Sequence, residues 1–166
     1  MKQTSRYIPL VALMGLASVG SALAAELPKE GSDDYTSCWA GTRNDITFSK
    51  TYTSFSFEII GTNRSIPPGG LFDNESFRCV GMNASFAGKN TGSWVCEASD
   101  PDGSKRLTSF TIGSDGKQIR EAVAGTGKYD GLVTSGNTVE QLGPFPDIKA
   151  GMSQGCNHQT GTYKLK

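Results

Sequence analysis

The feature of this chain that most constrains its fold is the absence of a sustained helical period after residue 30. Short segments rich in Thr, Val, Phe and Tyr follow one another instead, separated by Gly, Asn, Asp and Pro. Residues 51–60 alternate, so that Phe55, Phe57 and Ile59 share one face. An alternation with a period of two indicates strands that are buried on one side only. We therefore expect an all-β domain.

Eight strands are predicted, with two long loops at 63–74 and 143–155 and tight turns at most other connections. The predicted strands are 35–48, 51–62, 75–86, 92–99, 104–113, 117–124, 131–142 and 156–165. This spacing favours an antiparallel up-and-down eight-stranded barrel, because closure removes exposed sheet edges. A β-sandwich is the main alternative. An outer-membrane barrel is a weaker one, because charged and polar residues occur on both faces of the strands.

The first 24 residues have the pattern of a secretory signal peptide. Lys2 and Arg6 precede an uncharged segment rich in Leu, Val and Ala, which ends in Ala22-Leu23-Ala24 before the expected cut. A membrane anchor is the alternative, although Pro9, Gly15 and Gly20 interrupt the segment. We expect residues 25–34 to be flexible, residues 35–166 to form one barrel domain without a transmembrane segment, and the product to be periplasmic or secreted.

The four cysteines predict two disulfides and, through them, a strand register. If partner numbers in 75–86 and 92–99 sum to 175, Cys79 faces Cys96. The same register pairs Arg78 with Glu97, Val80 with Val95 and Gly81 with Trp94. Cys38 in the first strand and Cys156 in the last would then join across the seam of a closed barrel. This is the favoured pairing of the three that four cysteines allow.

Composition and motifs exclude several functions. The chain carries 16 basic and 16 acidic residues, which speaks against nucleic-acid binding. The segment 125–128 (GTGK) lacks the first glycine and the Ser/Thr of a phosphate loop, and 100–103 (DPDG) lacks the later ligands of a calcium loop. We interpret both as turns. Cys156 and His158 are two residues apart but form no recognisable zinc pattern, so we expect neither metal nor cofactor.

Few residues qualify as site candidates. The catalytic candidates are Glu58, Glu121, Arg120 and His158, and the ligand-binding candidates are Tyr52 and Trp94. A charged side chain that points into a barrel lumen must be paired or must change its pKa, and such groups are natural acid, base or ligand residues. The alternative for each is a solvated charge on the outer face. Aromatic side chains at Trp39, Tyr52, Phe55, Phe57, Phe77, Trp94 and Phe110 would either fill the lumen or line a cavity in it.

A family resemblance rests on three short pieces. The segment 124–131 (AGTGKYDG) resembles the Gly-Gly-Thr-Gly-Lys-aromatic segment of allene oxide cyclase and dirigent barrels, with Ala124 in place of the first glycine. Together with the hairpin Gly92–Gly103 and the final 160–163 (TGTY), it is more similar to uncharacterised exported bacterial proteins of the same build. The resemblance implies an eight-stranded antiparallel barrel, with a homodimer or homotrimer as in the plant families. It transfers no activity.

The sequence thus predicts an exported barrel that binds a small apolar or amphipathic ligand, or an envelope protein partner, without catalysis. One alternative is a cofactor-free isomerase or cyclase, in which Glu58 or Glu121 moves a proton while Arg120 or Tyr52 stabilises charge. The other is a structural module of the envelope with a filled interior.

Overall fold

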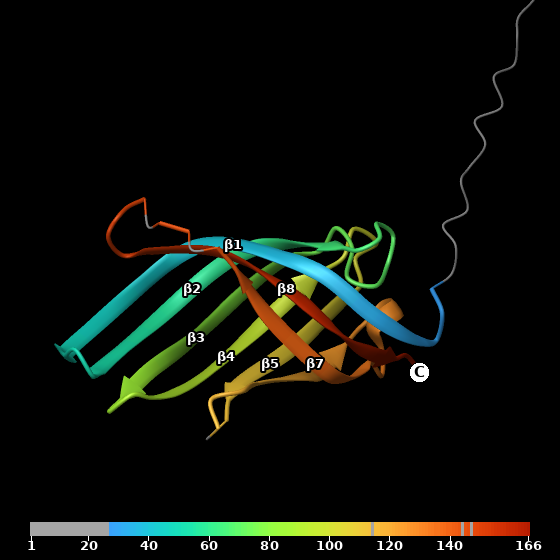
Figure 1. The fold of residues 1–166 in the computed structure, drawn as a ribbon. Helices are drawn as coiled ribbons and strands as arrows, with labels where there is room; N and C mark the ends of the chain where they lie inside the picture. Colours follow the sequence, from blue (N-terminus) through green and yellow to red (C-terminus); the bar gives the residue numbers. More distant parts are fainter. Residues whose placement is uncertain (1–26, 114, 144, 147) are drawn as a thin grey trace, which may run out of the picture.

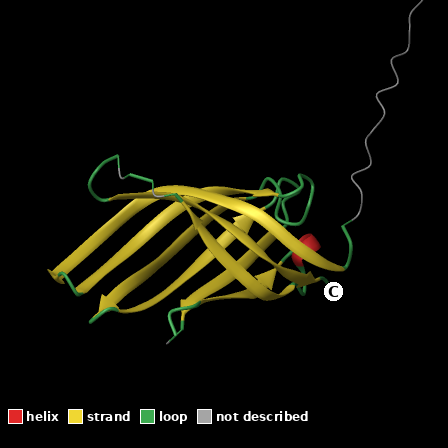
Figure 2. Cartoon of the chain, viewed as in Figure 1, coloured by secondary structure: helices red, strands yellow, loops and turns green. Residues whose placement is uncertain are grey.

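The computed structural model describes residues 27–113, 115–143, 145–146 and 148–166. In this part of the chain eight antiparallel strands form a nearly closed barrel, as Figures 1 and 2 show. The strands are β1 (Glu30–Ser49), β2 (Tyr52–Ser65), β3 (Ser76–Phe86), β4 (Lys89–Ser99), β5 (Lys105–Ile112), β6 (Gln118–Gly125), β7 (Val133–Leu142) and β8 (Met152–Lys164). A short 3-10 helix, η1 (Gly127–Tyr129), lies between β6 and β7. The predicted fold class is confirmed.

The strands are ordered β6-β5-β4-β3-β2-β1-β8-β7, so the first and last strands are neighbours as expected. Strand β1 pairs with β8 over residues 30–42 and with β2 over residues 35–49. The remaining seam lies between β6 and β7, where the side chain of Asn137 replaces a backbone ladder. Its Nδ2 donates to the Arg120 carbonyl oxygen at 3.1 Å, and its Oδ1 accepts from Arg120 Nη2. A bulge between Ser135 and Thr138 directs Asn137 toward β6.

The register predicted for β3 and β4 is confirmed, including Cys79 opposite Cys96 and Gly81 opposite Trp94. A Cβ atom on Gly81 would lie 2.1 Å from the Cβ of Trp94, so only glycine fits under this ring. Both predicted disulfides are present, Cys79–Cys96 and Cys38–Cys156. On the chain-entropy model they contribute about 3 and 4–5 kcal/mol respectively, because the second closes a much longer loop.

One consequence drawn from the register is wrong, namely the ion pair between Arg78 and Glu97. Arg78 Nε donates instead to Glu58 Oε1 at 2.7 Å, and Glu97 accepts from Lys105 Nζ at 2.9 Å. All four side chains are on the outer face, where Arg78 has an acidic neighbour on either side: Glu97 directly opposite on β4 and Glu58 diagonally across β2. The register determines which residues lie opposite each other. A long, exposed side chain can still pair either with the residue directly opposite or with a diagonal neighbour.

Four strands are longer than predicted, namely β1, β2, β4 and β8; β2 continues to Ser65 and β4 begins at Lys89. β1 begins at Glu30, so the second half of the segment expected to be flexible belongs to a strand paired with β8. β8 begins at Met152 rather than near 156, and in the added part a Cβ atom at Gly155 would lie 2.7 Å from Cζ2 of Trp39, so glycine leaves room for this ring. At the opposite end of β8, the Leu165 amide donates to the Lys29 carbonyl oxygen at 2.6 Å, so the first described residues lie beside the C-terminal ones.

The two ends of the barrel differ in their connections. We call the end that contains the β2–β3 loop 66–75, the β4–β5 turn and the η1 segment the closed end. The opposite end, which contains the other hairpins, is the open end (Figure 1). At the closed end Leu71 and Phe72 are inserted into the barrel beside Tyr35 and Tyr129. Phe72 adopts a φ of 70°, an uncommon conformation for a bulky residue that surrounding contacts must hold.

We call Leu71 and Phe72 the plug. The loop that contains them is held together by hydrogen bonds to Asp73. Its Oδ1 accepts from the Ser65 amide at 3.0 Å and its Oδ2 from the Gly69 amide at 2.9 Å. Two backbone donors at the base of the loop are thereby satisfied by one side chain. These bonds hold the loop in the conformation that places the plug inside the barrel.

The predicted signal peptide lies outside the described residues. Within the residues that are described, no helix has the length and apolarity needed to cross a membrane.

Candidate functional site

The interior beyond the plug contains a cavity of about 330 Å³. It is lined by inward-facing residues of all eight strands and extends toward the open end, where the exposed Gln141 contributes to its rim. Its volume lies at the small end of the range of about 300–1,000 Å³ for pockets that bind small molecules. The lumen is thus filled at one end and hollow at the other.

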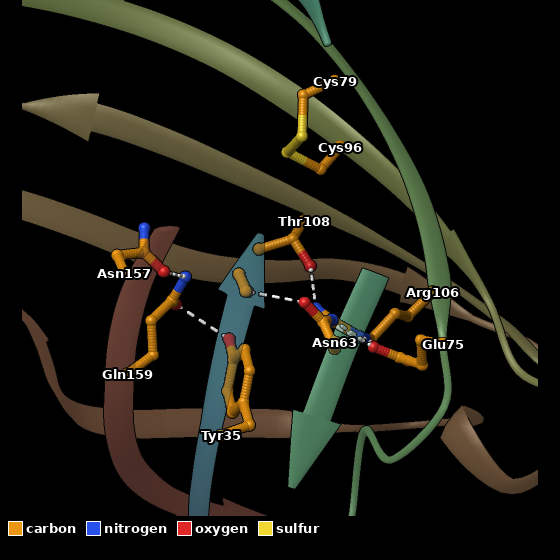
Figure 3. The surroundings of a disulfide bond; sticks show 10 residues. Tyr35, Asn63, Glu75, Cys79, Cys96, Arg106, Thr108, Asn157 and Gln159 are labelled. Atoms are coloured by element: carbon orange, nitrogen blue, oxygen red, sulfur yellow. Dashed lines mark hydrogen bonds and ion pairs between the residues drawn. A yellow bond between two sulfur atoms is a disulfide. The ribbon is translucent and has the colours of Figure 1, made fainter. Parts of the chain in front are cut away.

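One wall of the cavity is aromatic. Trp94 and Phe110 are stacked with ring centroids 5.2 Å apart and planes 6° apart, and Phe57 meets Trp94 edge-on at 6.2 Å. Six of the seven aromatic side chains expected in the lumen line this cavity: Trp39, Phe55, Phe57, Phe77, Trp94 and Phe110. The Cys79–Cys96 disulfide belongs to the same wall (Figure 3), whereas Cys38 is exposed on the outer face. This wall offers a polarisable apolar surface.

The wall formed by β6, β7 and β8 is polar but uncharged. Gln118, Gln141, Ser153, Asn157 and Gln159 line it. Gln159 Nε2 donates to Asn157 Oδ1 at 3.0 Å, which orients both amides. The side chains of Gln118 and Gln141 make no hydrogen bond with any other described residue. Each carboxamide can both donate and accept, so this wall can bind a polar edge of either kind.

The floor of the cavity is a buried ion pair. Arg106 Nε and Nη2 donate to the two oxygens of Glu75 at 2.9 and 2.7 Å. Asn63 Nδ2 donates to Glu75 Oε2 at 2.7 Å, and Ser37 Oγ donates to Asn63 Oδ1 at 2.5 Å. Figure 3 shows Asn63 of β2, Arg106 of β5 and Glu75, which directly precedes β3, converging below the disulfide in this view. The bidentate geometry is the strongest available for a guanidinium and a carboxylate.

Arg106 and Glu75 neutralise each other's charge. Burial would raise the pKa of Glu75, but the charge and hydrogen bonds of Arg106 outweigh burial and hold the pKa below its ordinary value. The third nitrogen of Arg106, Nη1, donates to Thr108 Oγ1 at 2.9 Å, and the guanidinium lies 4.1 Å from the centroid of the Phe72 ring. All three guanidinium nitrogens donate to protein groups, and Glu75 neutralises the charge, so little of it is available to a ligand in the cavity that Arg106 lines.

A second buried network lies beside the first and crosses the seam of the barrel. Arg120 Nη2 donates to Asp33 Oδ2 at 2.9 Å, and Nη1 donates to the Tyr35 hydroxyl at 2.6 Å. That hydroxyl donates to Gln159 Oε1 at 2.8 Å, so the network reaches the cavity wall through Tyr35 and Gln159. Burial raises the pKa of Tyr35, and the nearby Arg120 charge only partly opposes this. Tyr35 is therefore a neutral hydrogen-bonding group at neutral pH.

The structure separates the predicted site residues. Trp94 lines the cavity, and Arg120 points inward but is enclosed by its partners. Glu58 and Glu121 are exposed on the outer face, so the hypothesis that either one moves a proton in the lumen is wrong. The reason is strand alternation, since Phe57, Ile59 and Arg120, their neighbours in sequence, face inward.

His158 and Tyr52 also lie outside the lumen. His158 Nε2 is 2.7 Å from Asp34 Oδ1, and this contact joins the outer faces of β8 and β1. Tyr52 is exposed at the start of β2 and packs on Phe86, with ring centroids 6.5 Å apart. Neither side chain lines the cavity, so Tyr52 does not have the ligand-lining position considered for it.

Of the residues in the two networks, only Arg120 was a candidate from the sequence, and the acidic and amide partners Asp33, Asn63 and Glu75 are among those missed. Asp33 fell in the segment expected to be flexible, and Asn63 and Glu75 fell at the ends of a predicted loop and strand. One signal was available, because Arg106 alternates with Thr108 and Phe110 and so had to share the inner face of β5. An inward arginine requires a buried partner. Only the closed barrel shows which carboxylate supplies it.

Of the two motifs interpreted as turns, 100–103 is a turn, whereas 125–128 comprises the end of β6 and the start of η1. Gly103 and Gly127 have φ values of 87° and 58°, which favour glycine. Asp102 Oδ1 accepts from the Ser104 amide at 2.7 Å, and Asp100 is paired with Lys128. No group of three or more His, Cys, Asp or Glu side chains in the described ranges is arranged to hold a metal ion.

Comparisons with known proteins gave no match to this chain, whether made against family models, curated proteins or solved structures. What the chain does must therefore be inferred from its own geometry and chemistry.

Proposed function

We propose that this protein is an exported binding protein that holds a small, uncharged, amphipathic molecule in the open half of its barrel. The observation that carries the proposal is the two-sided cavity, with stacked aromatic rings on one wall and carboxamides on the other. A ligand with a flat apolar face and a polar edge matches both walls at once. Cavities in barrels of eight strands are of the size that holds one such molecule.

The ligand is uncharged because the cavity has no free charge to compensate it. Arg106 is the one charged residue among the described residues that line it, and Glu75 neutralises that charge. Moving an ion from water into such a site costs several kcal/mol or more unless a partner is supplied. Amide groups bind neutral hydroxyl, carbonyl or amine groups without that cost.

The residues that line the cavity also favour binding over catalysis. The carboxylates proposed for an isomerase are on the outer face. Among the described residues that line the cavity, Tyr35 has a pKa raised by burial, so it stays protonated at neutral pH and cannot accept a proton as a general base. A purely structural role with a filled interior fits less well, because only the closed end is filled.

The first experiment measures binding of the neutral fluorophore N-phenyl-1-naphthylamine to protein purified with both disulfides intact. We expect saturable binding that Gln118→Phe weakens at least tenfold, because the added ring occupies the cavity. The adjacent change Ile119→Phe, on the outer face of β6, is the matched control and should leave binding unchanged. An equal effect of the two substitutions, or no binding at all, would overturn the proposal.

The second experiment compares that probe with 8-anilino-1-naphthalenesulfonate, which adds a sulfonate to the same ring system. We expect the charged probe to bind at least tenfold more weakly. Equal affinity would retain the cavity as the site but refute the requirement for an uncharged ligand.

Export is part of the proposal and is supported by the two disulfides, which persist in oxidising compartments. Intact-mass measurement of protein from its own host should give a chain that begins at Ala25. A mass that includes residues 1–24 would contradict signal removal. The resemblance to exported barrel proteins of the allene oxide cyclase and dirigent type stays a prediction.

A further inference from the structure

Exposed aromatic side chains occur at only one end of the part of the molecule that the structure describes. Four aromatic residues there are exposed, Phe48, Tyr52, Phe86 and Phe145, and all belong to connections or strand ends at the open end. Three of them lie on the adjacent β1–β2 and β3–β4 hairpins. The closed end buries its aromatic residues in the plug. An exposed apolar cluster of this kind marks an interaction surface.

The two hairpin tips are fastened to each other. The Ala87 amide donates to the Thr51 carbonyl oxygen at 2.9 Å, and Tyr52 packs on Phe86. Phe48, at the bulge that precedes the β1–β2 turn, is 87% exposed. With Ile46, which is also exposed, these side chains form what we call the tip patch: Ile46, Phe48, Tyr52 and Phe86. Ladder pairing up to the turns holds the patch in a fixed arrangement.

Two lysines flank the tip patch, and the carboxylate next to it on β1, Asp45, is paired with Arg43. Residues 46–57 and 76–96 contain Lys50, Arg78 and Lys89 and no acidic residue. Lys50 and Lys89 stand in the two turns, and neither forms an ion pair with another described residue. Arg78 is neutralised by Glu58 further along the hairpins. The tips therefore present two uncompensated ammonium groups beside three aromatic rings.

This combination fits the surface of an anionic lipid bilayer. Phe and Tyr side chains partition into the boundary between headgroups and acyl chains, and flexible Lys side chains reach the headgroup phosphates. Each Lys near such a surface contributes about 1 kcal/mol of electrostatic attraction. A second copy of the chain fits less well, because two tip patches face to face would bring four ammonium groups together.

We propose that the tip patch docks this protein on an anionic bilayer surface, with the open end of the barrel toward the lipid. Docking in this orientation brings the rim of the cavity close to the bilayer boundary. The proposal concerns the hairpin tips alone, and its test does not depend on whether the cavity binds a ligand.

The test is co-sedimentation with vesicles of phosphatidylcholine containing 30% phosphatidylglycerol, compared with vesicles of phosphatidylcholine alone. We expect binding to the anionic vesicles that falls at least fivefold when Phe48 and Phe86 are both changed to serine. The control is Val123→Ser with Val133→Ser, which removes two exposed apolar side chains far from the tips. Thermal unfolding of each variant checks that the fold is retained.

Charge is tested with Lys50→Gln combined with Lys89→Gln, against Lys164→Gln combined with Lys166→Gln at the closed end. The tip pair should lower binding at least fivefold and the closed-end pair should not. The proposal is overturned if tip and control substitutions act equally, or if pure phosphatidylcholine binds as well. It is also overturned if size-exclusion chromatography shows a dimer that the Phe48 and Phe86 changes convert to a monomer, since a second copy is then the occupant.

Discussion

The closed and open ends of this barrel are built from the same eight strands and yet solve opposite problems. At the closed end a loop places Phe72 between Tyr35 and Tyr129, and two arginines are buried with their carboxylates. At the open end none of the described residues buries a charged side chain or inserts a loop, and the aromatic rings of the strands line the cavity. The difference indicates that stability is concentrated at one end, which leaves the other end free to bind.

The sharpest way to break this comparison is Glu75→Gln. It leaves Arg106 buried without its counter-ion, so we expect a loss of about 3–5 kcal/mol in the free energy of unfolding. The matched control is Glu58→Gln, which removes a carboxylate paired with Arg78 in solvent and should change stability little. Urea denaturation followed by circular dichroism measures both. A similar loss for the two variants would show that the closed end has no special role in stability.

A second variant addresses the seam. Asn137→Ala removes one hydrogen-bond acceptor of the Arg120 guanidinium and one donor to the Arg120 carbonyl. Hydrogen bonds to charged groups are worth about 1.5–3 kcal/mol, so the unfolding free energy should fall by about that amount. Hydrogen exchange at β6 and β7 should rise more than at β3 and β4. Uniform exchange would mean that Asn137 does not hold the seam.

At the open end the prediction concerns binding rather than stability. Trp94→Ala removes half of the stacked pair, and we expect the affinity for N-phenyl-1-naphthylamine to fall about tenfold, which is about 1.4 kcal/mol. The neighbouring Val95→Ala, on the outer face of β4, should leave the affinity unchanged. Isothermal titration calorimetry gives both values. Tighter binding to the Trp94 variant would show that the ring fills the cavity rather than forming a binding surface.

The smallest expected effect is that of pH, and it too distinguishes the ends. The pKa of Glu75 is depressed in the folded state below its ordinary value of 4.5. The unfolded chain therefore binds a proton at Glu75 before the folded chain does. Its contribution to stability is complete above about pH 4.5 and is lost as pH falls through the lower, folded pKa. Stability measured from pH 6 to pH 3 should fall less steeply in Glu75→Gln than in the natural chain, and parallel curves would contradict this assignment.

The sequence predicted the open end better than the closed end, for a physical reason. Alternation, turn residues and the Cys79–Cys96 register are local, and they place Trp94 and Phe57 on the inner wall directly. The closed end depends on pairs far apart in the chain, such as Arg120 with Asp33 and Arg106 with Glu75. Neither pairing follows from periodicity, since barrel closure alone brings those residues together. The inward insertion of Phe72 was equally hidden, because it lies in a loop with no alternation.

The pairing of β1 with β8 has a practical consequence for handling the molecule. Lys29 and Lys166 are joined by a hydrogen bond at the closed end, remote from the hairpins around the cavity. An affinity tag or surface tether attached after Lys166 would thus hold the molecule by its closed end and leave the entrance to the cavity at the open end accessible. A short linker between residues 29 and 166 would also permit circular permutation, with new chain ends cut into any exposed hairpin and every ladder kept intact.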